Sequence, residues 1–271
     1  MRIKLLTINI WNRSGPWEAR RELLRAGIEA LSPDVIGVQE VMGDGTHTLA
    51  HELALGLGYG VVYGEAKPLA GGITFGNAAL ARFPITKRAV ARLPGLDTDE
   101  QRSALFSEIE TPGGILPFVV THLAWRLHHG YVREAQVAAL ATAIDEHAHV
   151  DAARLPLVLC GDFNARPDAA EIRFLTGLQS LGGRSVYLCD AFEATGEGPG
   201  YTFDGRHNPF AAAFFELPRR IDYVFVRGPD ARGRGVPLSA KVVFTEVALG
   251  VAASDHYGVL AEIDYAARTS A

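Results

Sequence analysis

Short runs of β-branched and aromatic residues recur from one end of the chain to the other, and they restrict the possible folds more than any other feature of the sequence. Ten such runs lie at residues 3–10, 35–38, 60–63, 78–81, 103–109, 115–121, 155–160, 221–226, 241–245 and 257–263. The runs neither alternate regularly with helices, as in a parallel α/β sheet, nor follow one another as an all-β meander. The pattern therefore predicts sheets that pack face to face.

Helical spacing of apolar residues appears in four segments, so helices are the minority. The segments contain Leu24, Ile28 and Leu31 after Pro16; Leu49, Leu53 and Leu57 before Gly58; Val132, Val137, Leu140 and Ile144; and Ile172 and Leu175 after Pro167. Helices placed among strands in this way are expected to cover the outer faces of the sheets. The stretches 94–102, 193–210 and 227–237 are predicted to be loops. No fixed repeat or Ser/Pro linker divides the 271 residues, so residues 1–271 are expected to form a single domain.

Charge and composition argue against several classes of protein. Lys and Arg number 26 against 31 Asp and Glu, so no global positive field draws the chain to nucleic acid or anionic lipid. No run approaches the ~20 apolar residues that cross a bilayer, and we expect a cytoplasmic, monomeric protein without a transmembrane segment. Cys160 and Cys189 lack metal-site spacing and are expected to be reduced and buried. Phosphate-loop, HExxH and GxSxG motifs are absent from the sequence.

Polar residues at the ends of the apolar runs are the best candidates for chemistry, because a strand end holds a side chain rigidly at the rim of a sheet. These residues are Asn9, Glu40, His122, Asp162, Asn164, Asp255 and His256. Asp222 lies inside an apolar run, so its carboxylate needs a cationic or hydrogen-bonding partner. Taken singly, each residue has an ordinary structural explanation, such as a turn or a solvated strand end.

As a set, these side chains supply carboxylates, amides and imidazoles without a thiolate. Carboxylate and amide oxygens suit a hard divalent ion such as Mg²⁺ or Mn²⁺ better than zinc. Strand alternation predicts that Asp162 and Asn164 point to one side while Phe163 enters the core. The two polar groups would then share one cavity.

Six short motifs resemble, in order, those of the endonuclease/exonuclease/phosphatase superfamily, which includes deoxyribonuclease I, exonuclease III, neutral sphingomyelinases and inositol polyphosphate 5-phosphatases. They are Asn9 in its strand, Val38-Gln39-Glu40-Val41, Thr121-His122-Leu123, Gly161-Asp162-Phe163-Asn164, Arg220-Ile221-Asp222-Tyr223 and Ser254-Asp255-His256. The resemblance extends over nearly the whole chain. It implies an α/β, four-layer αββα sandwich of two mostly antiparallel sheets, with a site at one edge that hydrolyses phosphodiesters with Mg²⁺, Mn²⁺ being possible.

The resemblance also implies roles for individual residues. Glu40 is the principal metal ligand, with Asn9 beside it and Asp255 near the metal. Asp162 and Asn164 position the attacking water and the phosphate. These assignments place the metal and the water on neighbouring strand ends.

The two histidines are implied to hold or protonate phosphate oxygens, His256 as the partner of Asp222 and His122 from its own strand end. Pairing with a carboxylate would raise the pKa of His256. In one respect the chain departs from the nuclease branch, which often has an acidic residue where this chain has Phe75 and Asn77. The resemblance therefore does not say what orients His122.

Three functions remain open at this stage. Nucleic acid is the leading substrate class, and a small-molecule or lipid-headgroup phosphodiester of the sphingomyelinase type is the alternative. A catalytically silent binding scaffold is disfavoured because every main motif position is filled. Candidates for base stacking or a headgroup pocket are Trp11, Trp17, Trp125 and Tyr201, and candidate basic elements are Arg82, Arg126, Arg133 and the loop containing Arg227, Arg232 and Arg234.

Overall fold

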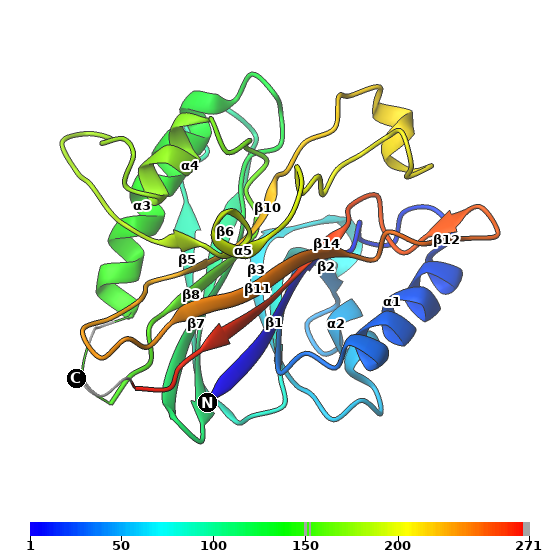
Figure 1. The fold of residues 1–271 in the computed structure, drawn as a ribbon. Helices are drawn as coiled ribbons and strands as arrows, with labels where there is room; N and C mark the ends of the chain where they lie inside the picture. The colour runs from blue at the N-terminus through cyan, green and yellow to red at the C-terminus, as the bar shows by residue number, and fades with distance from the viewer. Residues whose placement is uncertain (149–150, 152, 268–271) are drawn as a thin grey trace.

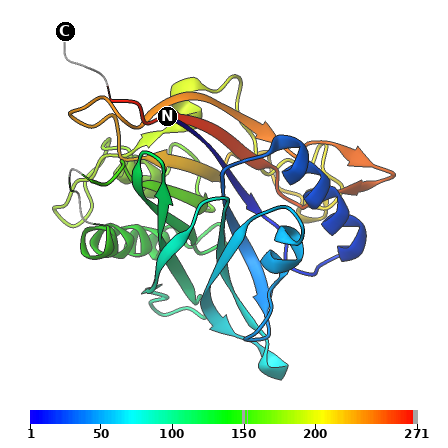
Figure 2. The same ribbon diagram turned by 90° about the horizontal axis from the view of Figure 1, so that it is seen from below.

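Two six-stranded sheets pack face to face with helices on their outer sides, as Figures 1 and 2 show for the computed structural model. The structure describes residues 1–148, 151 and 153–267. Helices α1 (Trp17–Leu31) and α2 (Leu49–Ala54) cover one sheet, and α3 (Gly130–His147) and α4 (Ala170–Leu175) cover the other. The expected four-layer αββα sandwich is therefore confirmed.

The first sheet has the strand order β11-β14-β1-β2-β4-β3. Its strands are β1 (Arg2–Asn9), β2 (Val35–Gly43), β3 (Gly60–Pro68), β4 (Thr74–Ala81), β11 (Val236–Val243) and β14 (Gly258–Asp264). A short hairpin, β12 (Val247–Ala248) and β13 (Val251–Ala252), precedes β14, and the single turn η1 (Ala70–Gly72) precedes β4. The β1–β2 pair is parallel and the other pairs in this sheet are antiparallel.

The second sheet has the order β5-β6-β7-β8-β10-β9. Its strands are β5 (Ile85–Leu93), β6 (Arg102–Thr111), β7 (Gly114–His122), β8 (Val158–Asp162), β9 (Cys189–Asp190) and β10 (Asp222–Val226). Helix α5 (Ala191–Thr195) follows β9, and η2 (Ala211–Phe214) lies in the long connection to β10. Only β7 and β8 run parallel in this sheet, so both sheets are mostly antiparallel, as expected.

The main core lies between the sheets, and it includes Leu5, Phe118 and Val120, which are at most 1% exposed. Strands buried on both faces read as nearly continuous apolar runs, which is why they stand out in the sequence. The sheets approach closely at Gly37, where an added Cβ would lie 2.4 Å from Cys160 Sγ. A larger residue at position 37 would force the two sheets apart.

Several of the expected boundaries of helices, strands and loops are wrong. The run 241–245 belongs to β11, which begins at Val236 inside the expected loop 227–237, and α5 overlaps the start of the expected loop 193–210. The second helix ends at Ala54 rather than Leu57, because Gly56 takes a φ of +74° that a helix does not allow. The edge strand β5 was not predicted; it is largely solvated and has four basic or polar residues among its nine.

The cysteines are both free, as expected, but only Cys160 is buried, whereas Cys189 is half-buried. Cys189 lies in the two-residue strand β9 at the edge of its sheet, where one side has no neighbouring strand. No helix in the described part of the chain is both long and apolar enough to cross a membrane.

Candidate active site

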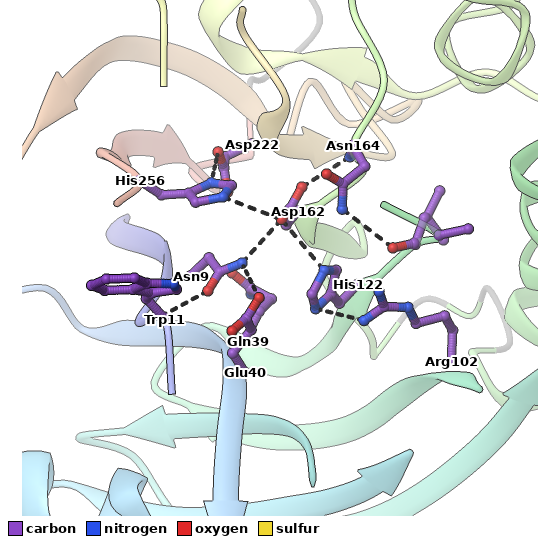
Figure 3. A network of polar contacts seen from close by, with 12 residues as sticks. Asn9, Trp11, Gln39, Glu40, Arg102, His122, Asp162, Asn164, Asp222 and His256 are labelled. Carbon is purple, nitrogen blue, oxygen red and sulfur yellow. Dashed lines mark hydrogen bonds and ion pairs between the residues drawn. The ribbon is translucent and has the colours of Figure 1, made fainter. Parts of the chain in front are cut away.

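Strand register brings the predicted polar residues to one edge of the sandwich (Figure 3). In the second sheet, His122 is paired with Asp162 across the parallel strands β7 and β8, and Asp162 is paired with Asp222 across β8 and β10. In the first sheet, Asn9 is paired with Gln39, the residue before Glu40. The carboxyl ends of two parallel pairs, one from each sheet, therefore meet at this edge.

The predicted residues surround a pocket of about 320 Å³. Glu40, His122, Asp162, Asn164, Asp255 and His256 line it. Asn9 and Asp222 lie behind the lining and contact Asp162 and His256, respectively. The structure thus brings together all eight candidate residues.

Amide groups hold the two central carboxylates. Asn9 Nδ2 donates to Glu40 Oε1 at 3.2 Å and to Asp162 Oδ2 at 3.0 Å, which links the two sheets. Asn12 Nδ2 donates to Glu40 Oε2 at 2.8 Å. The oxygen of Asn9 accepts from the backbone nitrogen of Trp11 at 2.9 Å. Glu40 is consequently fixed in place from two sides.

Glu40 lies in a strained backbone conformation, with a φ of +60°. The register of β2 against β4 shifts between Val38 and Val41, so Glu40 lies in a β-bulge. A left-handed φ costs a residue with a side chain about 1–2 kcal/mol. The bulge turns the half-buried carboxylate toward the pocket, and the surrounding fold maintains this strain.

Asp162 and Asn164 share the pocket, as the sequence predicted, but a turn rather than strand alternation places them there. Strand β8 ends at Asp162, and Asn164 has a φ of +50°. The backbone nitrogen of Asn164 donates to Asp162 Oδ1 at 2.9 Å, an Asx turn. Phe163 is fully buried in the core, as expected.

The buried Asp222 has the partner that its position requires, because its Oδ2 lies 2.9 Å from His256 Nδ1. Burial alone lowers the pKa of His256, but Asp222, Asp162 and Asp255 together raise it well above the usual value. The contact with Asp222 therefore favours the protonated form of the His256 ring. Its Nε2 lies 3.7 Å from Asp162 Oδ2 and faces the pocket.

The donor set fits a divalent cation. Burial, with the nearby charges of Glu40 and Asp162, raises the pKa of Asp255 to about 7. Several carboxylates crowded into one pocket repel each other, and a hard cation relieves that repulsion through oxygen ligands. Asp162, Asp222 and His256 also lie close enough to hold an ion, with ligand atoms within 4.8 Å, but His256 and Asp222 already share a hydrogen bond.

A fully buried arginine supports the loop that follows β1. The Arg20 guanidinium donates to the backbone carbonyls of Ile10, Trp11, Asn12, Ser14 and Ala253. Burial lowers the pKa of Arg20 to about 10, although Asp255 and Glu40 oppose this shift. Arg20 thereby ties the segment that presents Asn12 to the segment that precedes Ser254. The sequence did not single out this residue.

We expect Arg20→Met to lower the free energy of unfolding by at least about 3 kcal/mol, because several buried carbonyls lose their donor. Urea denaturation monitored by circular dichroism measures the change. Arg2→Met is the matched control, since the exposed ion pair of Arg2 with Glu262 contributes at most about 1 kcal/mol. An equally small effect of both substitutions would show that the carbonyl network does not stabilise the fold.

The cations at the pocket differ from those expected. Lys67, Arg102 and Arg219 line it. By contrast, Arg133 is buried in an ion pair with Glu171, and Arg82 stacks on a tyrosine away from the site. Positive charge at this edge comes from residues far apart in sequence, which no local pattern reveals.

Only some of the four aromatic candidates for stacking lie at the pocket. Trp11 and Trp125 line the pocket together with Phe75, Phe203 and Phe214. Trp17, the first residue of α1, is buried in the core, and Tyr201 lines a different pocket. Two of the four proposed stacking residues are therefore placed where they could contact a substrate.

A four-layer sandwich with this cluster at its sheet edge defines a DNase I-like hydrolytic domain. The model of the Endonuclease/Exonuclease/phosphatase family matches residues 6–256, and the chain belongs to this family of hydrolytic phosphoesterases and nucleases. The chain is 31% identical over 182 residues to the uncharacterized protein YbhP of Escherichia coli; the match covers 59% of this chain and 66% of that protein.

Solved structures show the same fold at low sequence identity. Danio rerio TDP2 complexed with single-strand DNA product has a TM-score of 0.77 at 19% identity, covering 97% of this chain and 99% of the other. The human Nocturnin catalytic domain with bound sulfate has a TM-score of 0.72 at 21% identity, covering 98% of this chain and 95% of the other. These similarities confirm the fold that the motifs implied.

Proposed function

We propose that the protein is a divalent-metal-dependent phosphodiesterase that hydrolyses its substrate with an activated water molecule, with nucleic acid as the leading substrate class. The observation that supports this most strongly is the convergence of Glu40, Asp162 and His256 on one pocket from both sheets. The complex of Danio rerio TDP2 with single-strand DNA supports the choice of substrate class. Mg²⁺ is the proposed ion, with Mn²⁺ as a substitute.

Glu40, Asn9 and Asp255 are the proposed metal ligands. A bound ion would neutralise charge on the phosphate and lower the barrier to attack. Asn12 keeps Glu40 pointing into the pocket through the 2.8 Å hydrogen bond. The side-chain oxygen of Asn9 accepts one hydrogen bond, from the backbone nitrogen of Trp11, so its second lone pair would be the one to bind the ion.

Asp162 and Asn164 are proposed to orient the attacking water. Burial, followed by the charge of Asp222, raises the pKa of Asp162, so this carboxylate is a stronger base than an exposed one. Its Oδ1 is fixed by the backbone of Asn164, and the carboxylate accepts the proton of the water.

The protonated His256 is proposed to stabilise the phosphate oxygens. Its Nδ1–H donates to Asp222, which leaves the Nε2–H to donate into the pocket. Phosphoryl transfer depends mainly on positioning and charge stabilisation, and this pair supplies both.

We expect hydrolysis to be abolished by EDTA and restored by excess Mg²⁺ or Mn²⁺. The assay compares a bis-aryl phosphodiester, a phosphomonoester, single- and double-stranded DNA, RNA and sphingomyelin, each with Mg²⁺ or EDTA. Full activity in EDTA after dialysis would contradict the metal dependence. Absence of hydrolysis of every diester would contradict the enzymatic proposal itself.

A small-molecule or lipid-headgroup diester is the second candidate. Phe214 lines the pocket, and Phe215 and Leu217 next to it are 96% and 82% exposed. Such an apolar rim suits a substrate that has an apolar group next to its phosphate. Preferential cleavage of sphingomyelin over DNA in the same assay would favour this candidate.

We expect a shallow salt dependence for an oligonucleotide substrate. Of the pocket cations, Arg102 pairs with Glu100 and Arg219 with Glu216, so Lys67 alone lacks an ion pair among the described residues. One or two phosphate contacts would raise KM about 3- to 12-fold between roughly 50 and 200 mM salt, whereas six to ten would raise it ~10³–10⁵-fold. The larger change, absent for a small diester, would reveal an extended nucleic-acid groove.

A further inference from the structure

His122 is contacted on both ring nitrogens. Neither contact comes from Phe75 or Asn77, the positions where the nuclease branch often has an acidic residue. Its Nδ1 lies 3.2 Å from Arg102 Nη1, and its Nε2 lies 3.5 Å from Asp162 Oδ2 (Figure 3). Phe75 packs near the ring with centroids 6.3 Å apart, and Asn77 donates instead to the Ser103 carbonyl. Arg102 therefore takes the orienting position.

The identity of this partner determines the tautomer of the ring. A guanidinium has five N–H donors and no acceptor, so His122 Nδ1 must accept the hydrogen bond with its lone pair. The ring proton then lies on Nε2, which faces Asp162 and the pocket. A doubly protonated ring would point an N–H at the guanidinium.

Burial and charge favour the same neutral form. Burial, followed by the positive charges of Arg102, His256 and Lys67, lowers the pKa of His122 well below its usual value. Asp162 is the acidic group that faces the ring. The two imidazoles of the site consequently have opposite kinds of partner, since a carboxylate contacts Nδ1 of His256 and a guanidinium contacts Nδ1 of His122.

Arg102 is itself held firmly. Its Nε donates to Glu100 Oε2 at 3.0 Å, and both side chains are more than nine-tenths buried. Arg102 is the first residue of β6, whose register against β7 pairs Ala104 with Thr121, the residue before His122. The guanidinium thus reaches the ring from a neighbouring strand with little freedom to move.

We propose that Arg102, anchored by Glu100, is a positioning residue that holds His122 as a neutral Nε2–H hydrogen-bond donor to the phosphate. The part of this inference that concerns phosphate rests on the proposed function. The tautomer of the His122 ring in the protein without substrate does not depend on that function.

Nitrogen NMR of protein labelled with ¹⁵N-histidine tests the tautomer directly, with the His122 signals assigned by their loss in His122→Gln. At neutral pH we expect a protonated Nε2 and a bare Nδ1. Arg102→Met should shift the pattern toward the other tautomer, whereas Arg92→Met, which removes an exposed arginine from the neighbouring β5, should not. An imidazolium pattern, or no response to Arg102→Met, would overturn the proposal.

Kinetics test the consequence for the reaction. We expect His122→Gln, which retains a neutral N–H donor, to keep kcat within about tenfold of the wild type, and His122→Ala to lose about 10²–10³-fold. Arg102→Met should lower kcat about 10–100-fold, with partial recovery in Arg102→Lys. Equal losses in His122→Gln and His122→Ala would contradict a neutral donor.

Folding is controlled separately, because removing Arg102 leaves Glu100 buried without its partner. The double variant Glu100→Gln/Arg102→Met removes both charges and should reproduce the kcat loss and the NMR shift with a near-native melting curve. If no phosphodiester is cleaved by the wild type, the proposed function fails, and the NMR pattern still decides whether Arg102 sets the tautomer of His122.

Discussion

Glu40→Gln is expected to lower kcat/KM by on the order of 10²–10³ with little loss of stability. The amide keeps the size of the carboxylate but lacks the charge that attracts a divalent ion. In the absence of metal, the substitution removes repulsion between Glu40 and Asp255. We therefore expect a melting temperature equal to or slightly above that of the wild type in EDTA.

Thermal melting with and without Mg²⁺ separates binding from folding in this variant. Mg²⁺ should raise the melting temperature of the wild type, since a ligand that binds the folded state stabilises it, and should do so much less for Glu40→Gln. Glu65→Gln, which changes a partly exposed residue on the edge strand β3, is the control and should respond like the wild type. A large loss of melting temperature in EDTA would show instead that Glu40 has a structural role.

Asp222→Asn is expected to lower kcat by about 10²–10⁴, the range that general acid–base groups contribute. Asparagine can still hydrogen-bond the ring, but it cannot stabilise the charged form of His256. Because nearby carboxylates hold the pKa of His256 above its usual value, losing one lets burial pull that pKa down. The alkaline limb of the pH–rate profile, where His256 loses its proton, should move to lower pH.

The pH profile also discriminates between two roles for Asp222. If the Asp162, Asp222 and His256 cluster held the metal, Asp222→Asn would weaken Mg²⁺ activation and leave the alkaline limb in place. Asp34→Asn is a suitable control, because Asp34 is a partly buried carboxylate that accepts a backbone hydrogen bond from Lys4 just before the start of β2, several residues along the strand from Glu40. Its profile should match that of the wild type.

The face-to-face sheets and the candidate residues could be predicted because strands and strand ends are visible in the sequence, and the resemblance implied that these residues meet at one edge. Buried strands are continuous apolar runs, so the polar residue that ends each run, such as Asn9 or His122, is conspicuous. The cost of an unpaired buried carboxylate predicted that Asp222 has a partner, and the resemblance implied that this partner is His256. The strand ends and the need for a partner are both visible in local patterns.

Other features could not be predicted, because they depend on tertiary contacts between segments without a distinctive local pattern. No local pattern singles out Arg102 or Arg20, yet both are buried. The solvated strand β5 lacks the apolar run that marks central strands. The bulge that turns Glu40 into the pocket arises from a register shift against β4, which the residues of β2 do not reveal.

The close approach at Gly37 and Cys160 has a consequence for partly unfolded states. Asn9 and Glu40 belong to one sheet and Asp162 to the other, so the hydrogen bond from Asn9 to Asp162 joins the two tightly packed sheets. A compact state with native-like strands but loosened side-chain packing would retain its far-ultraviolet circular dichroism and lose this alignment. Mild denaturant at constant pH should therefore abolish the proposed metal binding while the backbone signal persists, so metal affinity would report on how tightly the interior is packed.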